Sequence, residues 1–283
     1  MKKSAPAIAF LLPLWLTVFT LLPMLMVIAV SFLRRDESGF VAPVLTGDNY
    51  ARLLDPIYLK VFGHSLGMAA LATFLCLLAG YPFAYLLSRV RATWRPLLLT
   101  LVIVPFWTNS LARVYAMRGI LAAKGPVNNL LLALGVIDEP IRLLYTGAAV
   151  TLGLVYVLLP FMILPLYSSF EKFDRRLVEA ARDLGAGRFA TFRHVIVPLT
   201  TPGIAAGSLL VFLPALGMFY VTDVLGGARG LLIGNFLKDQ FLDARDWPFG
   251  AAASVLVIAL LFLFLAVHAL SRRGLVSGEA ADG

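Results

Sequence analysis

Six long apolar runs constrain this chain more than any other feature of its sequence. They cover residues 5–33, 64–88, 97–117, 143–168, 202–224 and 250–270. An apolar helix of about 20 residues crosses a hydrocarbon core about 30 Å thick. With 60% hydrophobic and only 14% charged residues, the 283-residue chain has too much apolar surface for a water-soluble domain. The sequence therefore predicts an all-α integral membrane protein with six transmembrane helices.

No linker, low-complexity tract or fixed-period repeat divides the chain, so we expect one transmembrane domain over residues 1–283. The first run follows Lys2 and Lys3, as the apolar part of a signal peptide does. Its apolar stretch is too long for a signal peptide, which indicates an uncleaved anchor helix.

The basic residues indicate the orientation of the chain in the membrane. With a cytoplasmic N-terminus, the inner segments 1–4, 89–96, 169–201 and 271–283 carry 13 Lys and Arg residues, and the longer outer loops carry 10. Basic residues are enriched in cytoplasmic loops. We therefore expect both termini in the cytoplasm. The net charge of +8 follows mainly from this topology, so we expect membrane lipid around the chain and no nucleic-acid partner.

The chain offers little for metal or covalent chemistry. The single cysteine, Cys76, lies inside a span and indicates a small packing residue. His64 and His268 lie at or near span ends without other metal-ligand residues at useful spacing, and we expect them at the membrane interface. The sequence predicts neither a metal site nor a catalytic group.

The inner segment 169–201 has the pattern of two short helices. Asp174 is placed to cap a first helix that begins at Arg175, and Gly185 is placed to end it. A second helix is expected from Arg188, ended by Pro198 before the fifth span.

One face of the first helix is apolar but shallow, with Leu177, Ala180, Ala181 and Leu184 at helical spacing. Two interpretations fit this pattern. The segment is an interfacial hairpin that only connects two spans, or it is a docking element for a protein outside the bilayer.

The spacing of five residues in this segment resembles a signature of permease subunits of bacterial binding-protein-dependent ABC importers. That signature reads Glu-Ala-Ala-x3-Gly-x9-Ile-x-Leu-Pro, and its counterparts here are Glu179, Ala180, Ala181, Gly185 and Pro198. Val195 and Val197 stand where isoleucine and leucine are usual, which keeps the apolar character.

The resemblance implies a type I ABC importer permease in a bacterial inner (cytoplasmic) membrane. It implies that the 174–198 segment enters a cleft on a cytoplasmic ATPase and couples ATP-driven closure to opening of the membrane path. The partners would be a second permease subunit, two ATPase subunits and a periplasmic substrate-binding protein. The chain has no Gly-x4-Gly-Lys-Ser/Thr loop, so we expect ATP and Mg²⁺ on the partner ATPase and no cofactor on this chain, which is not itself an enzyme.

Other stretches narrow the resemblance to permeases of spermidine/putrescine importers. They lie at Pro105–Tyr115, Leu134–Arg142, Leu159–Met162, Leu213–Asp223 and Asn235–Gly250. This resemblance is close over roughly residues 100 to 250 and extends to the rest of the chain in hydropathy. It implies polyamine import, although related permeases carry other small solutes.

Two charged residues, Arg113 and Asp223, lie in or near the ends of spans, where charge is costly unless it is paired or faces water. A linear polyamine would need carboxylates for its ammonium groups and aromatic faces for cation–π contacts. The candidate path residues are Asp223, Tyr220, Phe219, Trp107, Asn109 and Tyr115.

Each of these assignments has an alternative. Asp223 either faces the path, or lies at the interface or pairs with Arg113. Arg113 would repel a polyamine, so it is assigned to an ion pair or to gating. The polar residues near Trp107 and Asn109 suit a water-filled path, and polar contacts between helices explain them equally well.

Two further function classes compete with the permease interpretation. A membrane-embedded enzyme would need paired aspartates, a nucleophile with a base, or a metal triad, and the sequence shows no such grouping. A stand-alone secondary transporter often shows inverted repeats, and none is visible here.

Overall fold

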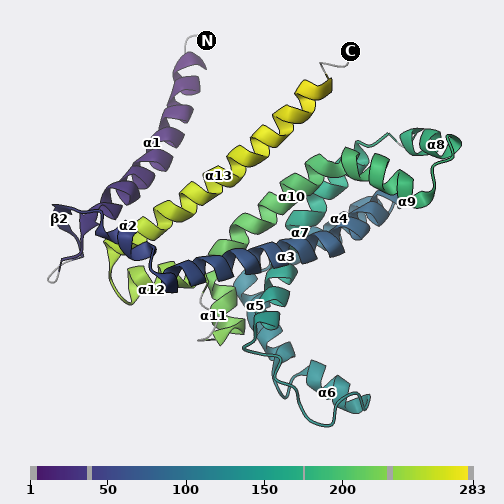
Figure 1. Ribbon diagram of the computed structural model, residues 1–283. Coiled ribbons are helices and arrows are strands. Elements are labelled where there is room, and N and C mark those ends of the chain that lie inside the picture. Colours follow the sequence, from purple (N-terminus) through teal and green to yellow (C-terminus); the bar gives the residue numbers. More distant parts are fainter. Residues whose placement is uncertain (1–4, 37–39, 175, 228–231, 280–283) are drawn as a thin grey trace. The chain divides into compact units, whose positions relative to one another are not determined.

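The computed structural model describes residues 5–36, 40–174, 176–227 and 232–279, with side chains described between residues 13 and 266 of these ranges (Figure 1). Helices form most of this part of the chain. The residues gather into two compact units, one formed by residues 1–60 with 236–283 and the other by residues 61–235. Each unit is described separately.

The first unit is built on two long helices. α1 (Ala5–Ser31) packs against α13 (Trp247–Glu279), and the short helix α2 (Asp48–Leu53) also packs against α13. Between α1 and α2, β1 (Leu33–Arg34) pairs antiparallel with β2 (Ala42–Leu45). The unit also holds the start of α3 (Pro56–Arg89) and the end of α12 (Ile233–Leu242).

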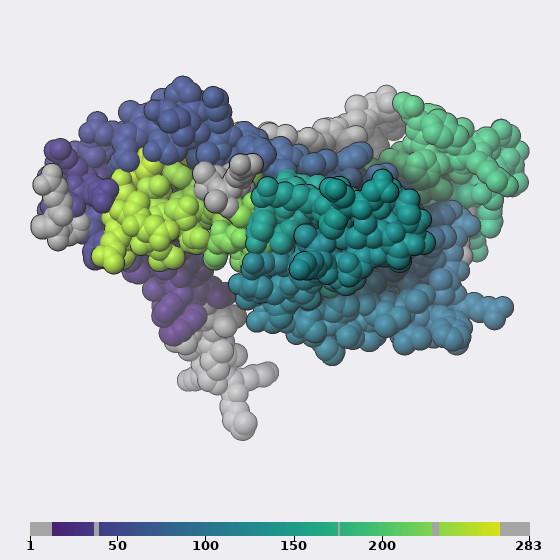
Figure 2. All heavy atoms as spheres, turned by 90° about the horizontal axis from the view of Figure 1, so that it is seen from below, coloured from purple at the N-terminus to yellow at the C-terminus, as the bar shows by residue number. Residues whose placement is uncertain are grey.

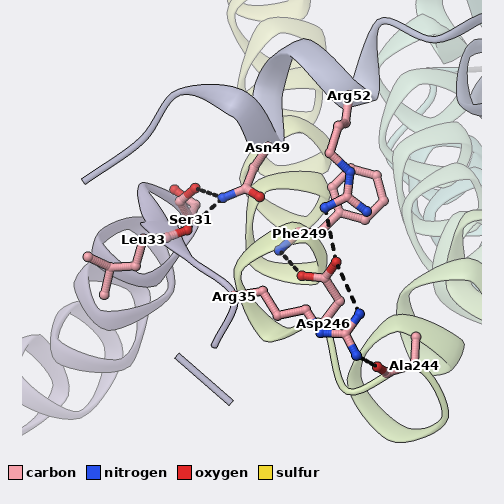
Figure 3. A network of polar contacts seen from close by, with 8 residues as sticks. All are labelled: Ser31, Leu33, Arg35, Asn49, Arg52, Ala244, Asp246 and Phe249. Carbon is pink, nitrogen blue, oxygen red and sulfur yellow. Dashed lines mark hydrogen bonds and ion pairs between the residues drawn. The ribbon is translucent and has the colours of Figure 1, made fainter. Parts of the chain in front are cut away.

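A buried carboxylate joins distant parts of the first unit (Figure 3). Asp246, whose side chain is 3% exposed, accepts a hydrogen bond from Arg52 Nη1 at 3.0 Å, and Arg35 Nη1 lies 4.0 Å from the same oxygen. The Arg52 guanidinium also lies over the Phe249 ring, 4.0 Å from its centroid. A buried carboxylate is costly unless paired, so these two arginines fix the 34–52 segment against the start of α13.

The second unit is a bundle with a short helical segment at one end (Figure 1). Its elements after α3 are α4 (Arg95–Trp107), α5 (Ser110–Leu121), α6 (Pro126–Ala133), α7 (Gly147–Glu171), α8 (Arg176–Asp183), α9 (Arg188–Thr191), the π-helical turn η1 (Phe192–Ile196), α10 (Val197–Gly217) and α11 (Phe219–Leu225). Its most extensive helix contact joins α7 and α10.

Small residues bring α7 and α10 close together. A Cβ atom at Gly207 would lie 2.7 Å from Met162 Sδ, and one at Gly203 would lie 2.8 Å from the Pro165 carbonyl oxygen. Two glycines four residues apart let helix backbones approach closely, which favours helix association in membranes. The α7–α10 pair therefore forms the core of this unit.

Among the described residues, five helices are long and apolar enough to cross a membrane. They are Pro13–Ser31, Pro56–Arg89, Gly147–Glu171, Arg188–Gly217 and Trp247–Ala266. A sixth candidate is formed by Arg95–Trp107 together with Ser110–Ala133, which meet at an angle of 91°. The all-α membrane architecture predicted from the apolar runs is confirmed.

The third apolar run, 97–117, is not one continuous helix as predicted. Thr108 is extended, with φ −78° and ψ 149°, and its hydroxyl donates a hydrogen bond to the Pro105 carbonyl oxygen at 2.6 Å. Asn109 then caps α5 by accepting a hydrogen bond from the Leu111 amide at 2.8 Å. Asparagine competes for backbone hydrogen bonds and so favours helix caps over helix interiors, which explains the break.

The prediction that Pro198 ends the second inner helix is wrong, because the helix continues from Arg188 to Gly217. In a regular α-helix Pro198 would remove a hydrogen bond and its ring would collide with the carbonyl one turn earlier. The preceding turn is instead π-helical, with the Val197 amide bonded to the Phe192 carbonyl. This wider turn accommodates the proline without ending the helix.

The fifth apolar run, 202–224, is also divided. α10 ends at Gly217, and Met218, with ψ 65°, separates it from α11. Asp223 therefore lies on a short helix of its own, beyond the end of the long one.

Candidate functional site

The inner segment begins with the predicted cap. Asp174 Oδ1 accepts a hydrogen bond from the Arg176 amide at 3.0 Å, and the Asp174 carbonyl accepts one from the Leu177 amide at 3.2 Å. The predicted first helical residue, Arg175, lies outside the described residues. A carboxylate satisfies amide groups that have no partner within the first turn of a helix, so Asp174 fixes where α8 starts.

Gly185 ends α8 in a left-handed conformation, with φ +84°. Its amide bonds to the Arg182 carbonyl at 2.9 Å, and the Ala186 amide reaches back to the Ala181 carbonyl at 3.0 Å. Helices commonly end this way on glycine, because a side chain disfavours positive φ. The helix stop predicted at Gly185 is confirmed, and the close turn sends the chain directly into α9.

The surface of this segment carries a few large apolar side chains among charged ones. Val178 is buried and anchors α8, whereas Leu184 is 89% exposed and Phe189 is 74% exposed. Leu177 on the predicted shallow face is 47% exposed, and Glu179 is exposed beside it. The segment is green in Figure 2. Its exposed side chains include Leu184, Phe189 and the Glu179 carboxylate. Ala180 and Pro198 are also exposed, and Ala181 is half-buried.

The second group of predicted residues lies on α11. Phe219, Tyr220 and Asp223 share this short helix, and the rings of Phe219 and Tyr220 lie edge to face with centroids 6.2 Å apart. Asp223 is exposed and Tyr220 is half-buried. Asp223 Oδ1 accepts a hydrogen bond from Asn235 Nδ2. The role of these three residues in a substrate path stays a prediction.

Asn235 is a residue of this group that the sequence analysis did not select. It is 4% exposed, and its Nδ2 also donates to the Phe219 carbonyl oxygen at 3.2 Å. One amide therefore joins both ends of α11 to the start of α12. A polar residue just after a glycine-rich stretch was the available signal, but its partners lie 12 and 16 residues away.

Arg113 lies on α5, which packs against α11 and α7. Its guanidinium carbon lies 5.8 Å from the ring centroid of Tyr156 on α7. Within the described part of the chain, Arg113 Nε is buried without a hydrogen-bond partner. The Tyr156 ring therefore provides this cation with a cation–π contact.

The remaining predicted path residues lie around the helix break. Trp107 is 79% exposed at the end of α4, and Tyr115 is 51% exposed on α5. The side-chain oxygen of Asn109 is used in capping α5. The described residues contain no cluster of three or more His, Cys, Asp or Glu side chains suited to a metal ion.

Solved structures of ABC transporters share the fold of this chain. The chain resembles a crystal structure of a bacterial ABC transporter involved in the import of the acidic polysaccharide alginate, with a TM-score of 0.74 over 96% of both chains. A structure of a bacterial alginate ABC transporter in complex with a periplasmic protein gives 0.75, also over 96% of both chains. The sequence identities are 19% and 18%, so these similarities establish the ABC importer permease fold alone.

Sequence relatives then identify the family. Residues 77–275 match the family described as "Binding-protein-dependent transport system inner membrane component", and the chain belongs to that family. The chain is 58% identical over 254 residues to the spermidine/putrescine transport system permease protein PotB of Escherichia coli K12, covering 90% of this chain and 92% of that protein. It is 56% identical to PotB of Haemophilus influenzae, covering 90% and 89%. It is also 31% identical to the inner membrane ABC transporter permease protein YdcU of Escherichia coli K12, covering 82% and 77%.

Proposed function

We propose that this chain is a permease subunit of a polyamine importer and forms half of the membrane path for spermidine or putrescine. The observation that carries the proposal is the 58% identity over 90% of the chain to permeases named for spermidine/putrescine transport. The acid and aromatic rings on α11 support it, because they offer groups that suit a chain of ammonium and methylene groups.

The substrate-facing part of the proposal centres on Asp223. Its carboxylate would attract one ammonium group while Phe219 and Tyr220 contact the adjoining methylenes. Trp107, Asn109 and Tyr115 would line the continuation of the path, and Arg113 would serve in gating. Asn235 would hold the Asp223 carboxylate in place, because it donates to that carboxylate and to the Phe219 carbonyl.

The energy-coupling part of the proposal centres on the 174–198 segment, within the cytoplasmic loop 169–201. Glu179, Ala180, Ala181, Gly185 and Pro198 would form the part that docks on an ATPase. The exposed Leu184 and Phe189 support this role, because a partner that covers them would bury apolar surface.

The assembly would contain a second permease subunit, two ATPase subunits that hold ATP and Mg²⁺, and a periplasmic binding protein that delivers the polyamine. Both termini of this chain would lie in the cytoplasm, with residues 1–283 acting as one transmembrane domain. ATP-driven closure of the ATPases would switch the permease pair between outward-facing and inward-facing states.

A second candidate function is import of another small solute by the same machinery. The more distant relative YdcU, named only as an ABC transporter permease, favours keeping this candidate. A secondary transporter or a membrane-embedded enzyme is a weaker alternative, because neither would need exposed apolar side chains on the 174–198 segment.

The decisive measurement is ATPase activity of the complete reconstituted importer with its binding protein, in the presence of spermidine, putrescine or no ligand. We expect a polyamine to stimulate hydrolysis in the wild type and Asp223→Asn to abolish that stimulation with assembly intact. If neither polyamine stimulates hydrolysis, the substrate is another solute. Stimulation that survives Asp223→Asn would remove Asp223 from the path, and uptake by the chain without any ATPase would overturn the ABC mechanism.

A further inference from the structure

A long groove opens between α3 and the segment that runs from α8 into α10. Its volume is about 680 Å³, and it lies wholly within the second unit. The α3 wall carries Phe74, Leu77, Leu78, Pro82 and two tyrosines, and the opposite wall includes Phe192, Ile196 and Ile204. Most of this lining is apolar, as a groove filled by hydrocarbon requires.

The length of the groove fits one half of a bilayer. Its α3 wall extends from Phe74 to Tyr85, and at 1.5 Å per residue this stretch of helix is about 16 Å long. One leaflet supplies about half of a hydrocarbon core about 30 Å thick, or about 15 Å. An acyl chain that enters at the Tyr85 end would therefore reach about as far as the bilayer centre.

Positive charge gathers at one end of this groove. Arg182 and Arg188 both contribute to its wall. Arg182 also lines an adjoining cavity of about 190 Å³ together with Tyr85, Arg89 and Glu179, which places it near the C-terminal end of α3. Glu179 opposes these three arginines with a single negative charge, so the end of the groove remains cationic.

The same end of α3 carries the marks of a membrane interface. The Arg89 guanidinium lies 4.5 Å from the ring centroid of Tyr85, and Trp94, just beyond the helix, is 57% exposed. Tryptophan and arginine are enriched where a helix leaves the hydrocarbon. If α3 leaves the hydrocarbon at these residues, the cationic end of the groove lies at the depth of lipid headgroups and its apolar part at the depth of acyl chains.

We propose that this groove binds an anionic phospholipid, with its phosphate held by Arg182 and Arg188 and one acyl chain lying along the α3 wall. Guanidinium groups match phosphate oxygens with paired hydrogen bonds, which makes arginine well suited to the headgroup. Both arginines belong to the inner segment, whereas most of the apolar wall belongs to α3. The bound lipid thus joins the inner segment to the bundle. The proposal rests on the proposed function only in assigning the lipid to the cytoplasmic leaflet.

The test measures lipid binding on the complete importer complex in mixed phosphatidylcholine and phosphatidylglycerol nanodiscs. Native mass spectrometry would count the phosphatidylglycerol molecules that stay bound to the wild type, to the double variant Arg182→Gln/Arg188→Gln, and to Arg193→Gln. Arg193 is an exposed arginine on η1 that does not line the groove, so it serves as the matched control. We expect each groove arginine to contribute about a fivefold preference for the anionic lipid, which the double variant loses and the control keeps.

A second variant tests the apolar part without altering charge. Leu77→Trp places a larger side chain in the groove, and we expect it to lower retention of phosphatidylglycerol while the arginines remain. Equal retention in wild type and in both groove variants would overturn the proposal. A disulfide that forms between the Leu77→Cys variant and a cysteine introduced into the second permease would also overturn the proposal, because a protein helix would then occupy the groove. Lipid retention is measured without substrate or ATP, so this result is independent of whether polyamines stimulate the ATPase.

Discussion

The inner segment and the α11 region differ sharply, although both adjoin α10, one at each end. The inner segment is held by a few buried side chains such as Val178 and Thr191, and it leaves Leu184 and Phe189 open. In α11, Val221 and Leu225 are fully buried and Asn235 joins both ends of the helix to α12. The first region leaves large apolar side chains uncovered, as the proposed docking role requires, whereas the second buries most of its apolar side chains within the chain. A substitution at an exposed position of the inner segment should therefore impair transport with little change in stability. A substitution in the α11 region should change both transport and stability.

The largest effect is expected from Glu179→Lys. Reversal of an exposed charge at a docking surface places like charges together, which costs several kcal/mol, so we expect polyamine uptake to fall about 100-fold. Membrane insertion should not change, and the thermal midpoint of the purified chain should fall only slightly, because Glu179 is exposed although it lines a cavity with Arg89 and Arg182. Uptake assays in cells with matched expression levels check this result. Unimpaired uptake would contradict the docking role of the segment.

Asn235→Leu should affect stability and transport together. It removes the donor to Asp223 and to the Phe219 carbonyl, and loss of hydrogen bonds to a charged group costs about 2 kcal/mol. We expect a lower thermal midpoint in detergent and a decrease in uptake. Asn129→Leu is the matched control, because Asn129 is exposed and donates one long hydrogen bond of 3.4 Å. Equal stability of the two variants would show that Asn235 does not hold α11 in place.

Two glycines of the inner segment differ in backbone conformation, and we expect replacing them with alanine to have smaller effects than Asn235→Leu. Gly185 has φ +84°, whereas Gly187 has φ −66°, and a Cβ atom at either position would meet nothing within 4 Å. An alanine in the left-handed conformation costs about 1 kcal/mol, so Gly185→Ala should loosen the turn and lower coupling several-fold. Gly187→Ala should leave ATPase stimulation close to wild type. Similar losses in both variants would point to chain flexibility rather than to backbone conformation.

The smallest effect on the isolated chain is expected from Leu184→Ala. This side chain is 89% exposed, and surface substitutions usually change stability by less than about 0.5 kcal/mol. Val178→Ala on the same helix removes a buried side chain and should cost about 1 kcal/mol or more. We expect Leu184→Ala to weaken binding of the ATPase with no change in thermal midpoint. Val178→Ala should lower the midpoint, which hydrogen exchange of α8 would localise.

The sequence predicted those features that depend on local chemistry. The capping aspartate at residue 174 and the helix stop at Gly185 follow from neighbouring residues, and the structure contains both. The apolar runs also form helices, although two of the six, 97–117 and 202–224, are divided. Predictions from neighbouring residues were wrong at two places where the backbone of a helix is irregular. Pro198 does not end its helix, because a π-helical turn precedes it, and the polar residues after Trp107 break a run that hydropathy treats as continuous.

Contacts between distant residues could not be predicted at all. The Arg52–Asp246 pair joins residues 194 positions apart, and the partners of Asn235 depend on how the chain returns after its glycine-rich stretch. A charged residue in a loop gives no indication of which opposite charge it will meet. The sequence therefore located the candidate acid, Asp223, but not the amide that positions it.

The π-helical turn has a mechanical consequence, because it joins α9 and α10 into one continuous helix, whereas the sequence predicts a break between them. The helix from Arg188 to Gly217 contains 30 residues and is about 45 Å long. Tilting a rod of that length by about 5° around its midpoint displaces each end by about 2 Å in opposite directions. A push on the inner segment would thus arrive at Met218 reversed in direction and undiminished in size, at the point where the chain turns into the helix that bears Asp223.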